Sequence, residues 1–166
     1  MLFLLYIRNM PNISNKAASA REGRFIEDIA GLLVPSGVPP AAARLYGHLL
    51  LCPRPVSLDE ITVSLGISKS SASVAARLLE SYTLARRHSE PGTKRVLYAV
   101  ADNYEAMIGQ QNRLLDALAE RLRAGAEIAR SKDASARLTE MAEFYAVMRT
   151  AMDDALRRWK RSRRPR

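Results

Sequence analysis

The chain has 166 residues, enough for one compact domain with extensions, and it is rich in alanine, leucine and arginine and poor in aromatic residues, which favours helices. Its formal net charge is +9, but the stretch from Arg157 to the end carries seven cations and no acid, so the rest holds only about +2. Net charge therefore identifies no partner. No stretch reaches the ~20 apolar residues of a membrane-spanning helix, and we expect a soluble cytoplasmic protein.

The N-terminal part is expected to divide into an extension and a helix. Residues 1–20 are predicted to be flexible or to pack on a partner, because the apolar start MLFLLYI is too short for a signal sequence and lacks a preceding basic region. Residues 21–36 are predicted to be helical, with Phe25 and Ile29 on an apolar face that belongs to the core or to a dimer contact.

Residues 39–101 are predicted to form one unit of three helices and a β-hairpin. Pro39 and Pro40 open the first helix. Ser57 and Glu60 have the spacing of a capping box, which predicts the start of a second helix. Gly66 would end that helix, and Ser68 would cap the third. Two helices joined by so short a turn must cross steeply, as in a helix-turn-helix.

The third helix, about 69–82, has a small-residue inner face and a polar outer face. Short hydroxyls and a few cations suit entry into a DNA major groove. The candidate groove contacts are Ser68, Lys69, Ser70, Ser71, Ser73, Val74 and Arg77. An ordinary amphipathic surface helix would show the same pattern.

The hairpin favours the DNA-binding interpretation. Residues 84–89 and 95–100 are predicted strands, joined by a turn that contains Pro91 and Gly92. Cations crowd this hairpin, and the candidate wing contacts are Arg86, Arg87, Lys94 and Arg95. A basic two-stranded tip beside a recognition helix can straddle the DNA backbone, although charges that protect a strand edge would give the same composition.

The stretch LGISKSSASVAARLLESYTLARRHSEPGTKRVLY resembles the DNA-binding segment of MarR-type transcriptional regulators, and within them the GbsR-like branch. The residues that match are Leu65, Gly66, Ile67, Ser68, Lys69, Ala72, Ser73, Leu79, Arg87, Pro91, Gly92, Lys94, Arg95 and Tyr98. The resemblance implies a winged helix-turn-helix that binds DNA, an N-terminal helix that joins the dimer contact, and a small-molecule effector. Thr83 departs from it, because a glycine often closes the recognition helix there.

Residues 102–160 are predicted to form two long helices, the first capped by Asp102, with a break near residues 131–133. Apolar residues recur on both at alternating spacings of three and four, which indicates helix-on-helix packing. The winged unit is too small to bury both stripes, so a homodimer is expected. The candidate interface residues are Phe25, Ile29, Leu115, Leu118, Leu122, Leu138, Met141, Tyr145, Met148 and Met152. Residues 161–166 are predicted to be a basic tail.

The remaining residues with reactive side chains suggest no other chemistry. Cys52 is the single cysteine, which excludes an intramolecular disulfide, and it is expected to be a small buried residue in preference to a redox sensor. His48 and His88 lie far apart in the sequence, so no metal site, cofactor or catalytic group is expected.

The sequence thus predicts a mainly α protein with a small β-hairpin, a homodimeric regulator that binds double-stranded DNA at a palindromic operator. The alternative is a winged-helix module that binds other proteins.

Overall fold

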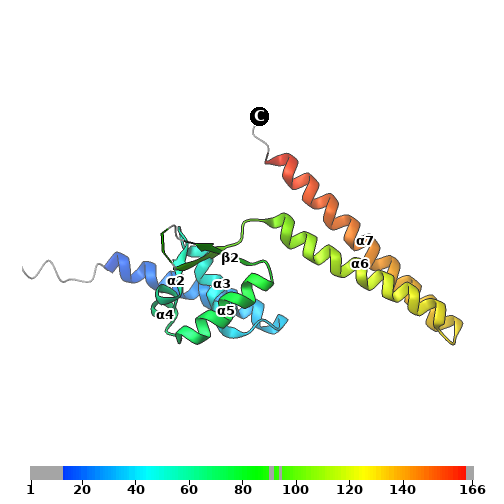
Figure 1. The fold of residues 1–166 in the computed structure, drawn as a ribbon, viewed down its shortest axis with the longest axis horizontal. Helices are drawn as coiled ribbons and strands as arrows, with labels where there is room; N and C mark the ends of the chain where they lie inside the picture. The colour runs from blue at the N-terminus through cyan, green and yellow to red at the C-terminus, as the bar shows by residue number, and fades with distance from the viewer. Residues whose placement is uncertain (1–12, 90–91, 94, 164–166) are drawn as a thin grey trace, which may run out of the picture. The chain divides into compact units, whose positions relative to one another are not determined.

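The computed structural model describes residues 13–89, 92–93 and 95–163, and the chain divides into two compact units (Figure 1). The first unit ends at Ala101, and the second begins at Asp102. No helix within the described ranges is both long and apolar enough to cross a membrane.

The first unit opens with two helices that lie close together. Helix α2 (Ile13–Leu33) leads through the 3-10 turn η2 (Val34–Ser36) to α3 (Pro40–Leu51). The expected start of α2 near Arg21 was too late, since the helix already includes residues 13–20, a stretch with several alanines, the strongest helix formers. A Cβ atom at Gly47 would lie 3.0 Å from the Cα of Ile26, so glycine there lets α3 approach the backbone of α2.

The predicted helix-turn-helix is present as α4 (Leu58–Leu65) and α5 (Lys69–Ser81). The capping box at the start of α4 is confirmed, because the Ser57 hydroxyl accepts from the Glu60 amide and the Glu60 carboxylate accepts from the Ser57 amide. Gly66 ends α4 in the left-handed conformation, with φ of 63°. That conformation costs glycine little and gives the chain its sharp turn into α5.

The core of this unit forms where α3, α4 and α5 meet. Its largest fully buried side chains are Leu45, Leu49, Ile61 and Leu79. The inner face of α5 is mostly alanine, and Ala72, Ala75 and Ala76 are each at most 3% exposed. Such small side chains let α5 pack closely on α3 and α4, so one face of α5 is fixed and the other remains in solvent.

The predicted hairpin is confirmed and gains a third strand. Strands β1 (Val56–Ser57), β2 (Ala85–Ser89) and β3 (Val96–Val100) form an antiparallel sheet in the order β1-β3-β2. β1 follows α3 and leads directly into α4, so the sheet joins the hairpin to the helix-turn-helix. The fold is therefore mainly helical with a small antiparallel sheet, as the sequence predicts for a winged helix-turn-helix.

Helix α5 ends in a left-handed turn that is occupied by a threonine and not by a glycine. The Leu84 amide donates to the Leu79 carbonyl and the Thr83 amide donates to the Glu80 carbonyl, each at 2.9 Å, which is the Schellman pattern of a helix end. Thr83 takes the left-handed position of that motif, with φ of 57°, and among the described residues it is the one non-glycine residue with a positive φ. The chain thus turns from α5 into β2 through a strained threonine.

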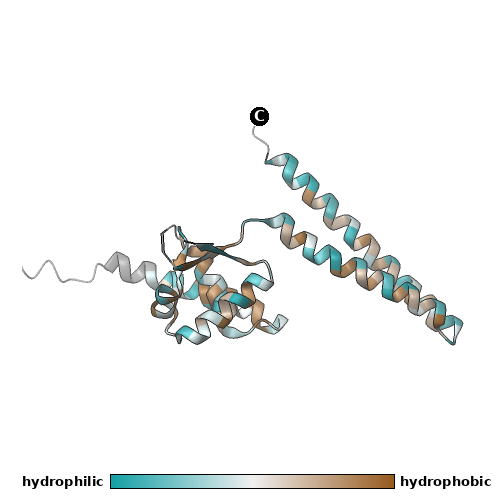
Figure 2. Ribbon diagram, in the orientation of Figure 1, coloured by the Kyte–Doolittle hydropathy of each residue, from teal (hydrophilic) through white to brown (hydrophobic). Residues whose placement is uncertain are grey.

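The second unit is a helical hairpin of α6 (Tyr104–Ile128) and α7 (Lys132–Ser162). The expected cap at Asp102 was wrong by one residue, because the Asn103 side chain accepts from the Ala106 amide and caps α6. Ser131 caps α7 in the same way. Both helices alternate hydrophobic and hydrophilic residues along their length (Figure 2), and Leu115, Ala119 and Ala142 are buried in this unit.

Replacing Thr83 with glycine should stabilise the first unit by about 0.5–1 kcal/mol, because the left-handed strain disappears although the unfolded chain gains freedom. Urea unfolding of the intact chain would measure the change. Thr83→Ala is the matched control, since it retains the strain of a Cβ atom and should bring no comparable gain. Destabilisation by Thr83→Gly would contradict the assigned strain.

The capping box should make stability depend on pH. Hydrogen bonds from the Ser57 amide, the Arg54 guanidinium and the Ser57 hydroxyl lower the pKa of Glu60 to about 2. Its unfolded value is about 4.3, so this contribution is complete above that pH and is lost as the pH falls toward about 2. Glu60→Gln should therefore flatten the decline of unfolding free energy in this window. Superimposable pH profiles of the two proteins would contradict the prediction.

Candidate nucleic-acid interface

The outer face of α5 carries nearly all the predicted groove contacts in exposed positions. Solvent reaches Ser68, Lys69, Ser70, Ser71, Val74 and Arg77, whereas Ser73 is half-buried. Val74 is 57% exposed, so the outer face of α5 also carries an apolar side chain. The exposed surface is thus a row of hydroxyls with one apolar side chain, and a cation at either end.

The serine hydroxyls at the start of α5 are ordered by one another. Ser68 Oγ accepts from the Ser71 amide at 3.1 Å, which makes Ser68 the N-cap. The same hydroxyl lies 2.9 Å from Ser70 Oγ and donates to Ser71 Oγ at 2.9 Å. Because capping occupies Ser68, Ser70 and Ser71 present the hydroxyls that are more readily offered to another molecule.

Lys69 is held by an ion pair, but weakly. Its Nζ lies 2.8 Å from Asp59 Oδ1 in the first turn of α4, and both side chains are about two-thirds exposed. An exposed ion pair of this kind contributes about 0–1 kcal/mol. The Lys69 ammonium can therefore leave Asp59 for a stronger anion at small cost.

The cations of the hairpin lie on different faces of the sheet. Arg87 pairs across the sheet with buried Tyr98, so it starts from the same face of the sheet as Tyr98, and its Nε lies 3.8 Å from a carboxylate oxygen of Glu80 on α5. Its side chain is nevertheless 56% exposed. Arg86 pairs with Ala99 and is exposed on the opposite face, since neighbouring residues of a strand point to opposite sides. Lys94 lies outside the described residues.

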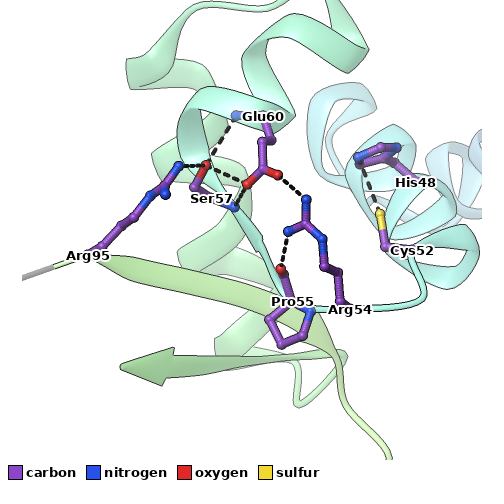
Figure 3. Close-up of polar contacts among 7 residues, drawn as sticks. All are labelled: His48, Cys52, Arg54, Pro55, Ser57, Glu60 and Arg95. Carbon is purple, nitrogen blue, oxygen red and sulfur yellow. Dashed lines mark hydrogen bonds and ion pairs between the residues drawn. The ribbon is translucent and has the colours of Figure 1, made fainter. Parts of the chain in front are cut away.

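Arg95 and Arg54 converge on the capping box, as Figure 3 shows. Arg95 Nη2 donates to Ser57 Oγ at 3.2 Å, and Arg54 Nη2 donates to Glu60 Oε1 at 2.6 Å. Sequence reasoning did not single out Arg54. The signal was present, because Arg54 lies six residues before a capping carboxylate, but this spacing has meaning only once β1 brings the two side chains together.

His48 and Cys52 form a contact at the end of α3, with Cys52 Sγ 3.5 Å from His48 Nε2. Burial raises the pKa of the Cys52 thiol and lowers the pKa of His48, in both cases as the largest cause. A raised thiol pKa favours the unreactive protonated form at neutral pH. This environment agrees with a packing role for Cys52.

The structure brings many of the predicted dimer residues into the seam between α6 and α7 of one chain. Leu115 is buried there, and half-buried positions are held by Leu118, Leu122, Leu138, Tyr145 and Met152. Met141 and Met148 are exposed on α7, as Phe25 is on α2. Sequence reasoning missed Phe144 and Val147, which are 59% and 67% exposed and extend the apolar surface of α7. Their heptad positions flank the predicted stripe.

Comparison with known proteins adds to this geometry. A family model described as "MmpR5-like MarR family transcriptional regulator" matches residues 102–162. The regulator MmpR5 of Mycobacterium tuberculosis is 29% identical over 148 residues, which cover 81% of this chain and 84% of that protein. The transcriptional repressor OpcR of Bacillus subtilis is 29% identical over 83 residues, which cover 50% of this chain and 45% of OpcR.

A solved structure described as a transcriptional regulator covers 85% of this chain and 99% of its own, with 28% identity and a TM-score of 0.72. The similarity thus extends over both units, whereas the resemblance noted in the sequence covers the first alone. With the winged helix-turn-helix geometry, these similarities relate the chain to MarR-family helix-turn-helix transcriptional regulators of the MmpR5-like kind.

Proposed function

We propose that the protein binds a palindromic operator in double-stranded DNA as a homodimer, with α5 in the major groove. The observation that carries this proposal is the division of α5 into a buried alanine face and an exposed face of serines and cations. Arg77 is the candidate for hydrogen bonds to a guanine, and Ser70, Ser71 and Lys69 are candidates for base edges or phosphates.

The wing is proposed to supply contacts to the phosphate backbone. Arg86, Arg87 and Lys94 are the candidates, and such contacts set position and general affinity without specifying sequence. Arg95 has a different environment, since its guanidinium donates to Ser57 within the same unit.

We further propose that a second copy of the chain covers the apolar surface of α7. Met141, Phe144, Val147 and Met148 are exposed there within a few turns, and contiguous exposed apolar patches mark interaction sites. A two-fold dimer would present two copies of α5 to half-sites one DNA turn apart. Phe25 and Ile29 of α2 are proposed to join the same contact.

Control by a small-molecule effector is also proposed, because the second unit contains a cavity of about 470 Å³ near the start of α6 and the end of α7. Its walls include Tyr104, Met107, Met152 and Trp159, with Arg163 beside them. Volume and lining suit an apolar ligand with one polar group. We also propose repression as the mode of action, because the similar protein OpcR is named a repressor. Membership of the GbsR-like branch is part of the same proposal.

Selection of bound sites from random duplex DNA with the purified protein would test the function. The expected result is a palindromic consensus whose half-sites lie about one helical turn apart. Absence of any enriched sequence, with binding that is weak and insensitive to salt, would favour the alternative of a protein-interaction module.

Substitutions of Arg77 and of Arg86 should affect DNA binding in different ways. Arg77→Gln should alter the preference among sites by about 1–3 kcal/mol, because a bidentate base contact is lost. Arg86→Gln should weaken binding to selected and random duplexes alike and reduce the slope of log affinity against log salt by about 0.9. Fluorescence anisotropy titrations over a range of salt would measure both. Equal loss by Arg77→Gln on both duplexes would move that residue to the phosphate contacts.

Val147→Asp should shift the protein from dimer to monomer. Loss of two buried valines, one from each copy, weakens association by about a hundredfold or more. Sedimentation velocity would measure the distribution. Thr150→Asp adds the same charge at an exposed polar position of α7 and should leave the dimer intact. An unchanged dimer in Val147→Asp would exclude this surface as the interface.

A further inference from the structure

The root of the wing, meaning the end of the β2–β3 hairpin that adjoins α4, is joined to α4 by few backbone hydrogen bonds. Strand β1 has two residues, and its pairing with β3 ends at Ser57 opposite Leu97. Arg95 lies two positions closer to the tip of the hairpin, beyond the last backbone pair. A side chain at this point can therefore add to the two backbone pairs of β1 with β3.

Arg95 provides that support by turning back toward α4 (Figure 3). Its Nη2 donates to Ser57 Oγ at 3.2 Å, a contact between residues 38 positions apart. The backbone amide of Arg95 donates to Thr93 Oγ1 at 3.1 Å, so the side of the hairpin nearer the tip is linked to the same residue. Arg95 thus lies between the wing and the helix-turn-helix.

The atom that receives Arg95 is held firmly. Ser57 is 2% exposed, its hydroxyl donates to Glu60 Oε2 at 2.7 Å, and the same oxygen accepts from the Glu60 amide at 3.3 Å. Arg54 donates to the other carboxylate oxygen of Glu60. The network therefore joins two guanidinium groups to the capping box, Arg54 at the Glu60 carboxylate and Arg95 at the Ser57 hydroxyl, and its centre cannot move without disturbing the start of α4.

We propose that Arg95 is a positioning residue, which fixes the root of the wing on the N-cap of α4 through Ser57 and so sets where the wing cations meet the DNA backbone. The inference rests on the proposed DNA-binding function. A wing arginine is generally expected to contact a DNA phosphate, whereas Arg95 acts through Ser57.

Three variants of the full chain test the inference, namely Arg95→Gln, Ser57→Ala and the double variant. Each is titrated over a range of salt against the duplex that the wild-type protein selects from random DNA. Urea unfolding gives the folded fraction, so that affinity refers to folded protein. Ser131→Ala is the matched control, because it removes the cap of α7 in the second unit and leaves the wing unchanged.

Arg95→Gln and Ser57→Ala should each lower the affinity of the folded protein about tenfold, since each breaks the same hydrogen bond to a charged group. The salt slope should stay unchanged in both, and the double variant should bind no worse than the weaker single variant. Arg95→Lys, which retains a donor, should recover part of the loss. Ser131→Ala should lower stability without changing affinity.

A salt slope reduced by about 0.9 in Arg95→Gln, with normal binding by Ser57→Ala, would make Arg95 a phosphate contact and overturn the inference. Lower stability with unchanged affinity in both single variants would make the bond purely structural and overturn it as well. Failure of the wild-type protein to select any duplex is a separate result, which would overturn the proposed function and the inference with it.

Discussion

The structure of the first unit depends on holding α5 by one face only. Alanines at 72, 75 and 76 bring the helix so close to α3 and α4 that little of its inner surface is exposed, and Leu79 completes the contact. Larger residues there would push α5 outward and change its tilt, because protein cores are closely packed and transmit such changes. A helix fixed in this way can present its exposed serines and cations at a defined angle, which a groove requires.

The turns at the two ends of α5 impose the second constraint. Gly66 ends α4 in a left-handed conformation at little cost, whereas Thr83 adopts nearly the same conformation with a branched side chain. The Schellman hydrogen bonds to Leu79 and Glu80 maintain that strained residue and direct the chain into β2. The orientation of the wing relative to α5 therefore depends on this turn on one side, and on Arg95 and Ser57 on the other.

The two long amphipathic helices of the second unit contain more apolar surface than one helical hairpin can bury. Packing of α6 on α7 covers Leu115 and Ala142, yet Phe144 and Val147 stay exposed. A polar group also lies in the seam, where Asn112 Nδ2 donates to Asp153 Oδ1 at 2.6 Å and Arg149 contacts Asp153 at 2.9 Å. Because Asn112 is buried, its hydrogen bond to Asp153 favours one register of α6 on α7, so the exposed stripe on α7 has a defined position.

The sequence alone determined the order of elements, the capping box of Ser57 and Glu60, the turn at Gly66 and the two faces of α5, because these features depend on neighbours within a few residues. Local spacing also indicated the hairpin and the long helices. Only the tertiary structure decided that β1 joins the sheet, that Arg87 and Arg95 turn toward Glu80 and Ser57, and which half of each apolar stripe α6 and α7 bury in one another. Those outcomes depend on pairs of residues far apart in the chain, whose proximity no local pattern encodes.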